Sequence, residues 1–235
     1  MNTPAPNSDE GPASEHACSR CGARYLRSLP PSGLCWECER RDRDAAEWRE
    51  KARKASGVPA RFERFRSWSE LRGPDAYVRC IAAVKRFAEH GDSVLAMIGT
   101  RGTGKTQAAA VAIWQSIDEG RSAKYTTALQ LLADLKGRYG GDGSAESDWL
   151  AEWTRPHLLC IDEIAERLDT PHAAVMLAAL VDARYGKLRP TLLVGNVTPE
   201  RFAECVGGSI ADRCNEGGGI VRFDKWASFR RGDTA

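Results

Sequence analysis

Apolar residues follow two spacings along residues 75–223. Tyr77, Ile81, Val84 and Phe87 recur every three or four positions, which predicts an amphipathic helix over 75–89. Short apolar runs then alternate with longer helical stretches. The expected strands are 93–98, 123–127, 157–161, 191–195 and 220–223, and the expected helices between them are 105–118, 128–137 and 172–186. This alternation predicts an α/β fold with a parallel five-stranded sheet flanked by helices.

The rest of the chain divides by composition. Residues 1–16 are rich in Pro, Ser, Asn and Gly and predict a disordered tail. A cysteine module at 17–38 and a charged helical linker at 39–55 follow, and the main domain is expected at 56–235, after the helix breakers Gly57 and Pro59. The Gly-rich stretch 137–147 predicts a mobile loop.

Charge and hydropathy exclude several classes of protein. The chain has 34 Lys and Arg against 32 Asp and Glu, so nucleic-acid binding would need a local basic patch. No apolar run reaches the length of a membrane span, and the first residues lack the features of a signal peptide. We therefore expect a cytoplasmic protein that does not bind membranes.

A glycine-rich motif directly follows the strand expected at 93–98. GTRGTGKT at 99–106 matches the phosphate-binding pattern G-x-x-x-x-G-K-[ST] between a strand and a helix. Its glycines let backbone amides converge on an anion, and the helix adds its positive end. Lys105 can reach the β and γ phosphates, and the Thr106 hydroxyl can ligate Mg²⁺. The nucleotide-binding loop is expected to comprise Gly99, Thr100, Arg101, Gly102, Thr103, Gly104, Lys105, Thr106 and Gln107.

Polar residues end two of the expected strands. In LLCIDE, Asp162 would hold Mg²⁺ and Glu163 would act as general base toward a water, although an acid pair can also cap a helix. TLLVGN ends in Asn196, on a strand expected between the loop strand and the acid strand. Its amide can hydrogen-bond the γ phosphate or the water, whereas the alternative interpretation is an ordinary turn residue. Open parallel sheets bind ligands at this edge.

A later motif, SIADR, places Ser209 and Arg213 one helical turn apart. Arg213 could reach a neighbouring subunit's nucleotide as an arginine finger, because a guanidinium there stabilises the transition state. The alternative is a solvated or ion-paired surface arginine.

Together these segments resemble the AAA+ ATPases. SGVPARFERFRSW before the core and SIADRCNEGGGIVRFDKWASFR at the end are similar to the helicase loaders of the DnaC/DnaI kind and to IstB-type transposition ATPases, over residues 56–230. The resemblance implies ATP hydrolysis, with Lys105 and Thr106 as Walker A, Asp162 and Glu163 as Walker B, Asn196 as sensor 1 and Arg213 as the finger. It also implies that the C-terminal helical lid of most AAA+ proteins is missing.

Two CxxC pairs lie before the main domain. Cys18 and Cys21 are separated by 13 residues from Cys35 and Cys38, a workable spacing for a four-cysteine zinc ribbon. So short a segment cannot build a hydrophobic core, so zinc would supply its folding free energy. A redox dithiol is the competing interpretation. Composition leaves open whether the module contacts protein or nucleic acid, and the resemblance favours docking on a replicative helicase.

The function expected from this resemblance is ATP-dependent loading of a hexameric replicative helicase onto single-stranded DNA, by an ATP-dependent homo-oligomer. An IstB-like ATPase acting on double-stranded DNA and a small-molecule P-loop kinase are the alternatives. Candidates for a single-strand groove are Lys85, Arg86, Arg121, Lys124, Lys136 and Arg138, with Tyr125 and Tyr139 nearby.

Overall fold

The computed structural model describes residues 15–26, 28–139, 145–164 and 171–229. The chain divides into two compact units, residues 1–50 and 51–235, and the boundary lies within helix α1 (Trp36–Lys54). The predicted disordered tail lies almost wholly outside the described residues, as does the middle of the loop predicted at 137–147. None of the described helices is long and apolar enough to cross a bilayer.

The first unit is a small cysteine-rich module. Strand β1 (His16–Ala17) pairs antiparallel with β2 (Arg24–Tyr25). Helix α1 then begins at Trp36, so Cys38 lies in its first turn and not before it. The buried residues here are three of the cysteines, and only partly buried side chains pack around them. The module therefore has almost no apolar core of its own.

The second unit is built on one parallel sheet, in the order β4-β5-β6-β3-β7. This confirms the predicted five-stranded parallel sheet. The expected strands fall within one residue of those observed, which are β3 (Val94–Ile98), β4 (Ala123–Thr127), β5 (Leu158–Asp162), β6 (Thr191–Gly195) and β7 (Gly219–Arg222). Strand β6 lies between the loop strand β3 and the acid strand β5, so their carboxyl ends share one edge.

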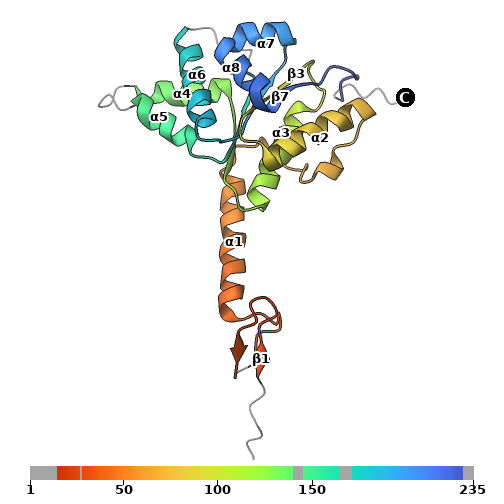
Figure 1. Cartoon of the computed structure of the whole chain (residues 1–235), viewed down its shortest axis with the longest axis vertical. Helices are drawn as coiled ribbons and strands as arrows, with labels where there is room; N and C mark the ends of the chain where they lie inside the picture. Colours follow the sequence, from red (N-terminus) through yellow and green to blue (C-terminus); the bar gives the residue numbers. More distant parts are fainter. Residues whose placement is uncertain (1–14, 27, 140–144, 165–170, 230–235) are drawn as a thin grey trace, which may run out of the picture. The chain divides into compact units, whose positions relative to one another are not determined.

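Helices cover both faces of the sheet (Figure 1). Alternate residues of β3 point to opposite sides: Leu95 and Met97 join one core, and Ala96 and Ile98 join the other. The first core is completed by α2 (Asp75–His90) and α3 (Lys105–Asp118). The second is completed by α4 (Ala128–Arg138), α5 (Ala145–Thr154), α6 (Pro171–Tyr185), α7 (Pro199–Val206) and α8 (Gly208–Arg213).

Short segments connect these elements. They are the 3-10 helices η1 (Ala60–Phe62) and η2 (Trp68–Glu70) before α2, and the single π-helical turn η3 (Cys214–Gly218) before β7. The described residues after β7, 223–229, form no helix.

A fully buried arginine fixes the amino-terminal edge of the sheet. Arg184 on α6 donates to the Thr191 hydroxyl (2.9 Å) and to five backbone carbonyls, which belong to the end of α5 and to the residues just before β5 and β6. Burial lowers the pKa of its guanidinium to about 9. Since backbone oxygens saturate the guanidinium, this side chain has a structural task at the edge opposite the functional residues.

Candidate functional site

The phosphate-binding loop joins β3 to α3 and needs glycine at two positions. Gly99 and Gly104 have φ of 132° and 94°. A Cβ on Gly99 would lie 2.4 Å from the Phe223 carbonyl oxygen, and one on Gly104 would lie 2.8 Å from the Tyr77 ring. No other residue fits either position without displacing its neighbours. The loop therefore faces the amino end of α3, and Phe223 and Tyr77 pack closely against its backbone on the other side.

Lys105 lies at the centre of this loop. Its ammonium Nζ donates to the carbonyls of Gly99 (3.0 Å) and Thr100 (2.6 Å), and the side chain is buried. The Thr103 hydroxyl donates to the same Thr100 carbonyl at 2.8 Å. These contacts hold a positive charge beside the backbone amides at the start of α3, where an anion gains from both.

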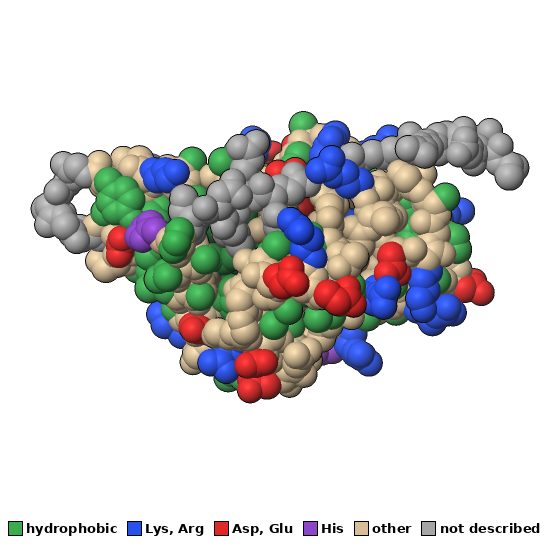
Figure 2. Space-filling view, turned by 90° about the horizontal axis from the view of Figure 1, so that it is seen from above, with side chains coloured by type: hydrophobic (Ala, Val, Ile, Leu, Met, Phe, Trp, Pro, Cys, Tyr) green, Lys and Arg blue, Asp and Glu red, His purple; other side chains and the backbone are tan. Residues whose placement is uncertain are grey.

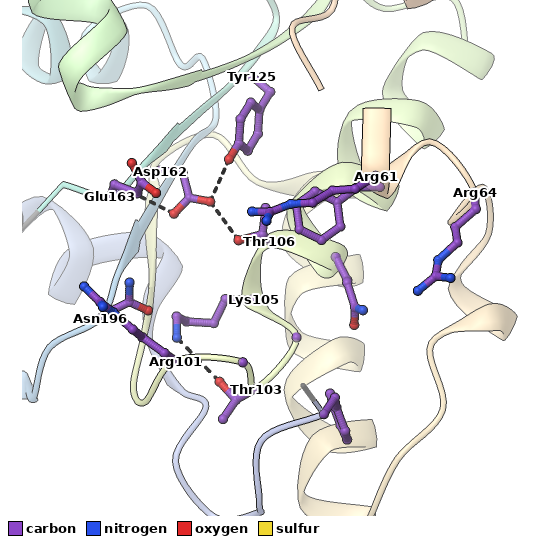
Figure 3. A pocket seen from close by; sticks show the side chains of 15 residues that line it. Arg61, Arg64, Arg101, Thr103, Lys105, Thr106, Tyr125, Asp162, Glu163 and Asn196 are labelled. Atoms are coloured by element: carbon purple, nitrogen blue, oxygen red, sulfur yellow. Dashed lines mark hydrogen bonds between the residues drawn. The ribbon is translucent and has the colours of Figure 1, made fainter. Parts of the chain in front are cut away.

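A buried carboxylate faces the loop from β5. Asp162 Oδ2 accepts hydrogen bonds from the Thr106 hydroxyl and from the Tyr125 hydroxyl, each at 2.8 Å (Figure 3). Burial, together with the Asp162 charge, raises the pKa of Tyr125 well above its usual range, so its phenol stays a donor. A hydroxyl oxygen beside a carboxylate is a hard-oxygen donor set, which fits Mg²⁺.

Glu163 follows Asp162 in an uncommon backbone conformation. Its φ is 59°, in the left-handed region that costs a side chain with a Cβ about 1–2 kcal/mol. The Glu163 amide donates to Asp162 Oδ1 at 2.7 Å, which stabilises this turn. As a result Glu163 is exposed to the cavity while Asp162 and Ile164 on either side are buried. Strain of this kind is concentrated at functional sites.

One cavity of about 630 Å³ brings the predicted residues together. Figure 3 shows that Lys105, Thr106, Asp162, Glu163 and Asn196 all face it, from α3, β5 and the end of β6. The lining residues are Arg61, Phe62, Arg64, Arg101, Gly102, Thr103, Gly104, Lys105, Thr106, Gln107, Tyr125, Asp162, Glu163, Asn196 and Phe229. Of the predicted loop, Gly99 and Thr100 lie behind this surface and contact Lys105.

Five residues that line this cavity were not predicted as part of the nucleotide site. Tyr125 comes from β4, and Phe229 comes from the segment after β7. Arg61 and Phe62 on η1 and Arg64 just after it also line the cavity, and Figure 3 shows the two arginines on one side of it. Each of the two arginines lies over the phenylalanine that follows it, with 4.6 Å from the Arg61 guanidinium carbon to its ring centroid. The sequence does repeat an Arg-Phe dipeptide in ARFERF. The spacing of this repeat does not distinguish residues of a binding site from ordinary surface residues.

The segment after β7 returns to the phosphate loop. The Trp226 indole donates to the Thr103 carbonyl (3.1 Å), and the Phe229 amide donates to the Gly102 carbonyl (2.9 Å). Both rings pack edge-on against Tyr77 of α2. The loop is thus supported by residues more than 120 positions away in the sequence.

Arg213 does not line this cavity. It lies at the end of α8, with its guanidinium carbon 4.5 Å from the centroid of the Tyr185 ring. Its nitrogens lie 3.5 Å from Asp182 and 3.4 Å from Glu216, and Ser209 also donates to Asp182. Arg213 is therefore ion-paired at the surface within its own chain, and it does not contact the residues around Lys105.

The residues proposed for a single-strand groove do not form one surface. Lys85 and Arg86 lie on α2, which packs on one face of the sheet, whereas Lys136 and Arg138 lie on α4, which packs on the other. Tyr125 is buried beside Asp162. The prediction of a groove made by this set is wrong, because proximity in sequence does not tell on which face of a sheet a helix packs.

Ion pairs also involve several of these basic residues. Lys85 lies 3.8 Å from Glu89 and Lys124 lies 3.8 Å from Glu152, and Arg138 pairs with Glu152 at 2.7 Å. Acidic and basic side chains are interspersed on the part of the face in Figure 2 that is not drawn in grey. These ion pairs and this mixture of charges therefore do not indicate a basic groove that would bind a phosphate backbone.

The four predicted zinc ligands form a single cluster. The Sγ atoms of Cys18, Cys21, Cys35 and Cys38 all lie within 4.8 Å of one another, and those of Cys21 and Cys35 are 3.8 Å apart. Tetrahedral zinc with Zn–S bonds of about 2.3 Å would place its sulfur ligands roughly 3.8 Å apart. One cluster of four thiols fits zinc better than two separate redox pairs. The other four cysteines are also free thiols, and all four belong to the second unit.

Comparisons with known proteins agree with this geometry. Residues 35–211 match the family of IstB-like ATP binding proteins. The replicative helicase loader DnaC of Escherichia coli (strain K12) is 25% identical over 159 residues, which cover 66% of this chain and 65% of that protein, so the match spans less than two thirds of the relative.

Solved structures share the fold. The crystal structure of the DnaC helicase loader superposes with a TM-score of 0.61 at 15% identity, covering 70% of this chain and 99% of that one. The structure of DnaI gives a TM-score of 0.59 at 17% identity, covering 71% and 95%. The matched family model covers most of the chain, including the phosphate-binding loop, Asp162 and Asn196. The chain belongs to the family of IstB-like ATP binding proteins.

Proposed function

We propose that this protein is a Mg²⁺-dependent ATPase that loads a replicative helicase onto single-stranded DNA. The observation that carries the ATPase part is the single cavity in which Lys105, the Thr106–Asp162 pair, Glu163 and Asn196 meet at the carboxyl edge of the sheet. The proposal of helicase loading is supported by the sequence similarity to the replicative helicase loader DnaC and by the shared fold. Family membership supports ATP as the nucleotide.

Each residue of the cavity has a role in hydrolysis under this proposal. Lys105 and the loop amides would bind the β and γ phosphates, and Asn196 would orient the attacking water. Thr106 and Asp162 would hold Mg²⁺, which when bound neutralises phosphate charge. Glu163 would take a proton from the water as its oxygen bonds to the γ phosphorus and the bond to ADP breaks. Its exposure to the cavity gives it access to that water.

We further propose that the cysteine module binds zinc and docks on the helicase. The module is a separate compact unit with a large exposed aromatic side chain at Trp36, and its cysteines fit zinc. Aromatic side chains are enriched in protein interfaces. A helicase loader places the helicase on single-stranded DNA, so we expect the chain to contact that strand. We propose no particular residues for this contact.

A pull-down with purified hexameric helicase tests the loader function. The full chain is expected to bind the helicase in the presence of ATP and to bind labelled single-stranded DNA in a salt-dependent way. The alternative is an IstB-like ATPase acting on double-stranded DNA, and the match to the family of IstB-like ATP binding proteins keeps it open. Failure to bind helicase together with ATP-dependent binding of duplex DNA would select that alternative.

Arg213→Ala is expected to keep ATP affinity and lose most hydrolysis if Arg213 completes a neighbour's site. An arginine finger contributes about 10³-fold or more to kcat. The prediction rests on its position outside its own cavity. Phosphate release measured over a range of protein concentrations checks the effect, and exposed Arg201→Ala on α7 is the matched control.

Mixing separates a shared site from a site within one chain. Arg213→Ala keeps an intact nucleotide loop, and Lys105→Ala keeps an intact finger, so an interface between the two variants would contain one complete site. The mixture should recover part of the hydrolysis that each variant lacks. Two inactive variants that stay inactive when mixed would make Arg213 a structural residue that holds Asp182 and Glu216 together.

A further inference from the structure

Tyr125 is a buried tyrosine whose hydroxyl ends in the nucleotide cavity. It lies on β4, the edge strand next to β5, and the register pairs Thr127 with Asp162. Tyr125 is two residues earlier on the same face, close enough for an aromatic side chain to reach the carboxylate diagonally. The hydroxyl donates to Asp162 Oδ2 at 2.8 Å (Figure 3).

Three donors determine how the Asp162 carboxylate is oriented. Oδ2 accepts from Thr106 and Tyr125, and Oδ1 accepts from the Glu163 amide. Thr106 belongs to the phosphate loop, and Glu163 belongs to the strained turn. Tyr125 is the donor among these three that comes from another strand and has no assigned contact with nucleotide or water. A carboxylate fixed from outside the reacting groups keeps its direction when those groups bind ligand.

The backbone of Tyr125 is itself fixed from the other side. Its amide donates to the Ser56 carbonyl at 2.7 Å. A Cβ on Gly57 would lie 2.3 Å from the Tyr125 carbonyl oxygen, and Gly57 has a φ of 77°, so this close approach requires glycine. The segment directly after α1 thus pairs with the free edge of β4 at this residue and holds the ring in place.

We propose that Tyr125 is a positioning residue for the metal site: its hydroxyl holds the Asp162 carboxylate in the orientation that binds Mg²⁺ together with ATP. This rests on the proposed ATPase function. Tyr125 touches neither nucleotide nor reacting water in this assignment and acts through Asp162. The ring also fills space in the core, so packing has to be separated from the hydroxyl.

Tyr125→Phe makes this separation because it keeps the ring and removes one hydroxyl. The measurement is binding of a fluorescent ATP analogue to the full chain, first in EDTA and then during titration with MgCl₂, followed by kcat at saturating Mg²⁺. We expect affinity in EDTA to stay within about twofold, and the Mg²⁺ concentration for half-maximal tightening to rise about tenfold, in the range typical for loss of a ligand's supporting hydrogen bond. The kcat should recover partly at high Mg²⁺.

Thr126→Val is the matched control. It removes a buried hydroxyl from the neighbouring residue of the same strand, on the opposite face of the sheet, where it donates to the Thr127 carbonyl. In this variant the Mg²⁺ concentration for half-maximal tightening of nucleotide binding and the Mg²⁺ dependence of kcat should both stay at the parent values. A merely structural hydroxyl would lower the melting temperature of Tyr125→Phe without changing its Mg²⁺ titration, and that result overturns the assignment. If the parent protein itself shows no Mg²⁺-dependent tightening and no hydrolysis, the proposed function fails, and this assignment fails with it.

Discussion

Glu163→Gln is expected to bind ATP with nearly unchanged affinity and to hydrolyse it about 10²- to 10⁴-fold more slowly, the usual contribution of a positioned general base. Glutamine has the same length and the same hydrogen-bonding reach but cannot accept a proton from water. It also keeps the Cβ and backbone conformation of the left-handed turn at φ 59°, so the neighbouring Asp162 contact should survive. Single-turnover hydrolysis and equilibrium nucleotide binding separate these two effects.

Two further variants bracket this result. Lys105→Ala removes the buried ammonium beside the loop carbonyls, so it should weaken ATP binding itself. Glu204→Gln changes an exposed acid on α7 by the same chemistry and should leave both binding and turnover at the parent level. Parent-like turnover by Glu163→Gln would remove Glu163 as the base and leave Asn196 or another cavity residue to orient the water.

Cys35→Ser is expected to release the zinc ion and unfold the cysteine module while the ATPase unit stays folded. Structural zinc contributes about 10–16 kcal/mol of apparent binding free energy in small domains, far more than this module's packing supplies. Cys35 is completely buried and its sulfur lies 3.8 Å from the Cys21 sulfur of the other pair, so its loss affects both CxxC pairs. Elemental analysis measures the metal, and circular dichroism with limited proteolysis measures the two units separately.

The matched control for this variant is Cys205→Ser on α7, a thiol outside the cluster. It should keep one zinc per chain. Helicase binding should be lost with Cys35→Ser and kept with Cys205→Ser, whereas affinity for ATP should be kept in both, because the nucleotide cavity lies wholly in the second unit. Protein purified under reducing conditions and found free of metal would falsify the zinc assignment.

Much of the core of the nucleotide cavity could be predicted from local pattern. The motif at 99–106 places its loop between a strand and a helix, and parallel strands share their carboxyl edge, so Lys105, Asp162 and Asn196 had to meet there. Register and strand order bring them together as expected. The prediction agrees with the structure because each of these residues follows a strand that a clear apolar run identifies in the sequence.

Helix α5 shows where local pattern is insufficient. The sequence predicts a polar loop over 137–147, yet a helix begins at Ala145 and buries Trp149 and Trp153 one turn apart. Their indoles donate to the Leu131 carbonyl and to Asp134 of α4. A ten-residue helix is marginal by itself, so its stability comes from these partners and not from its own sequence.

Periodicity and motif spacing alone determined the five strands, the helices α2, α3, α4 and α6, the phosphate loop and the two cysteine pairs, because each of these is a pattern within about twenty residues of the chain. The tertiary structure decided what depends on distant segments: Phe229 and Trp226 against the loop, Arg61 on the cavity wall, and the Tyr125–Asp162 hydrogen bond. It also decided that α2 and α4 cover opposite faces, which separates the basic residues. Such contacts depend on the order of the strands in the sheet and on where the segment after β7 packs. Neither produces a periodic pattern in the nearby sequence from which it could be predicted.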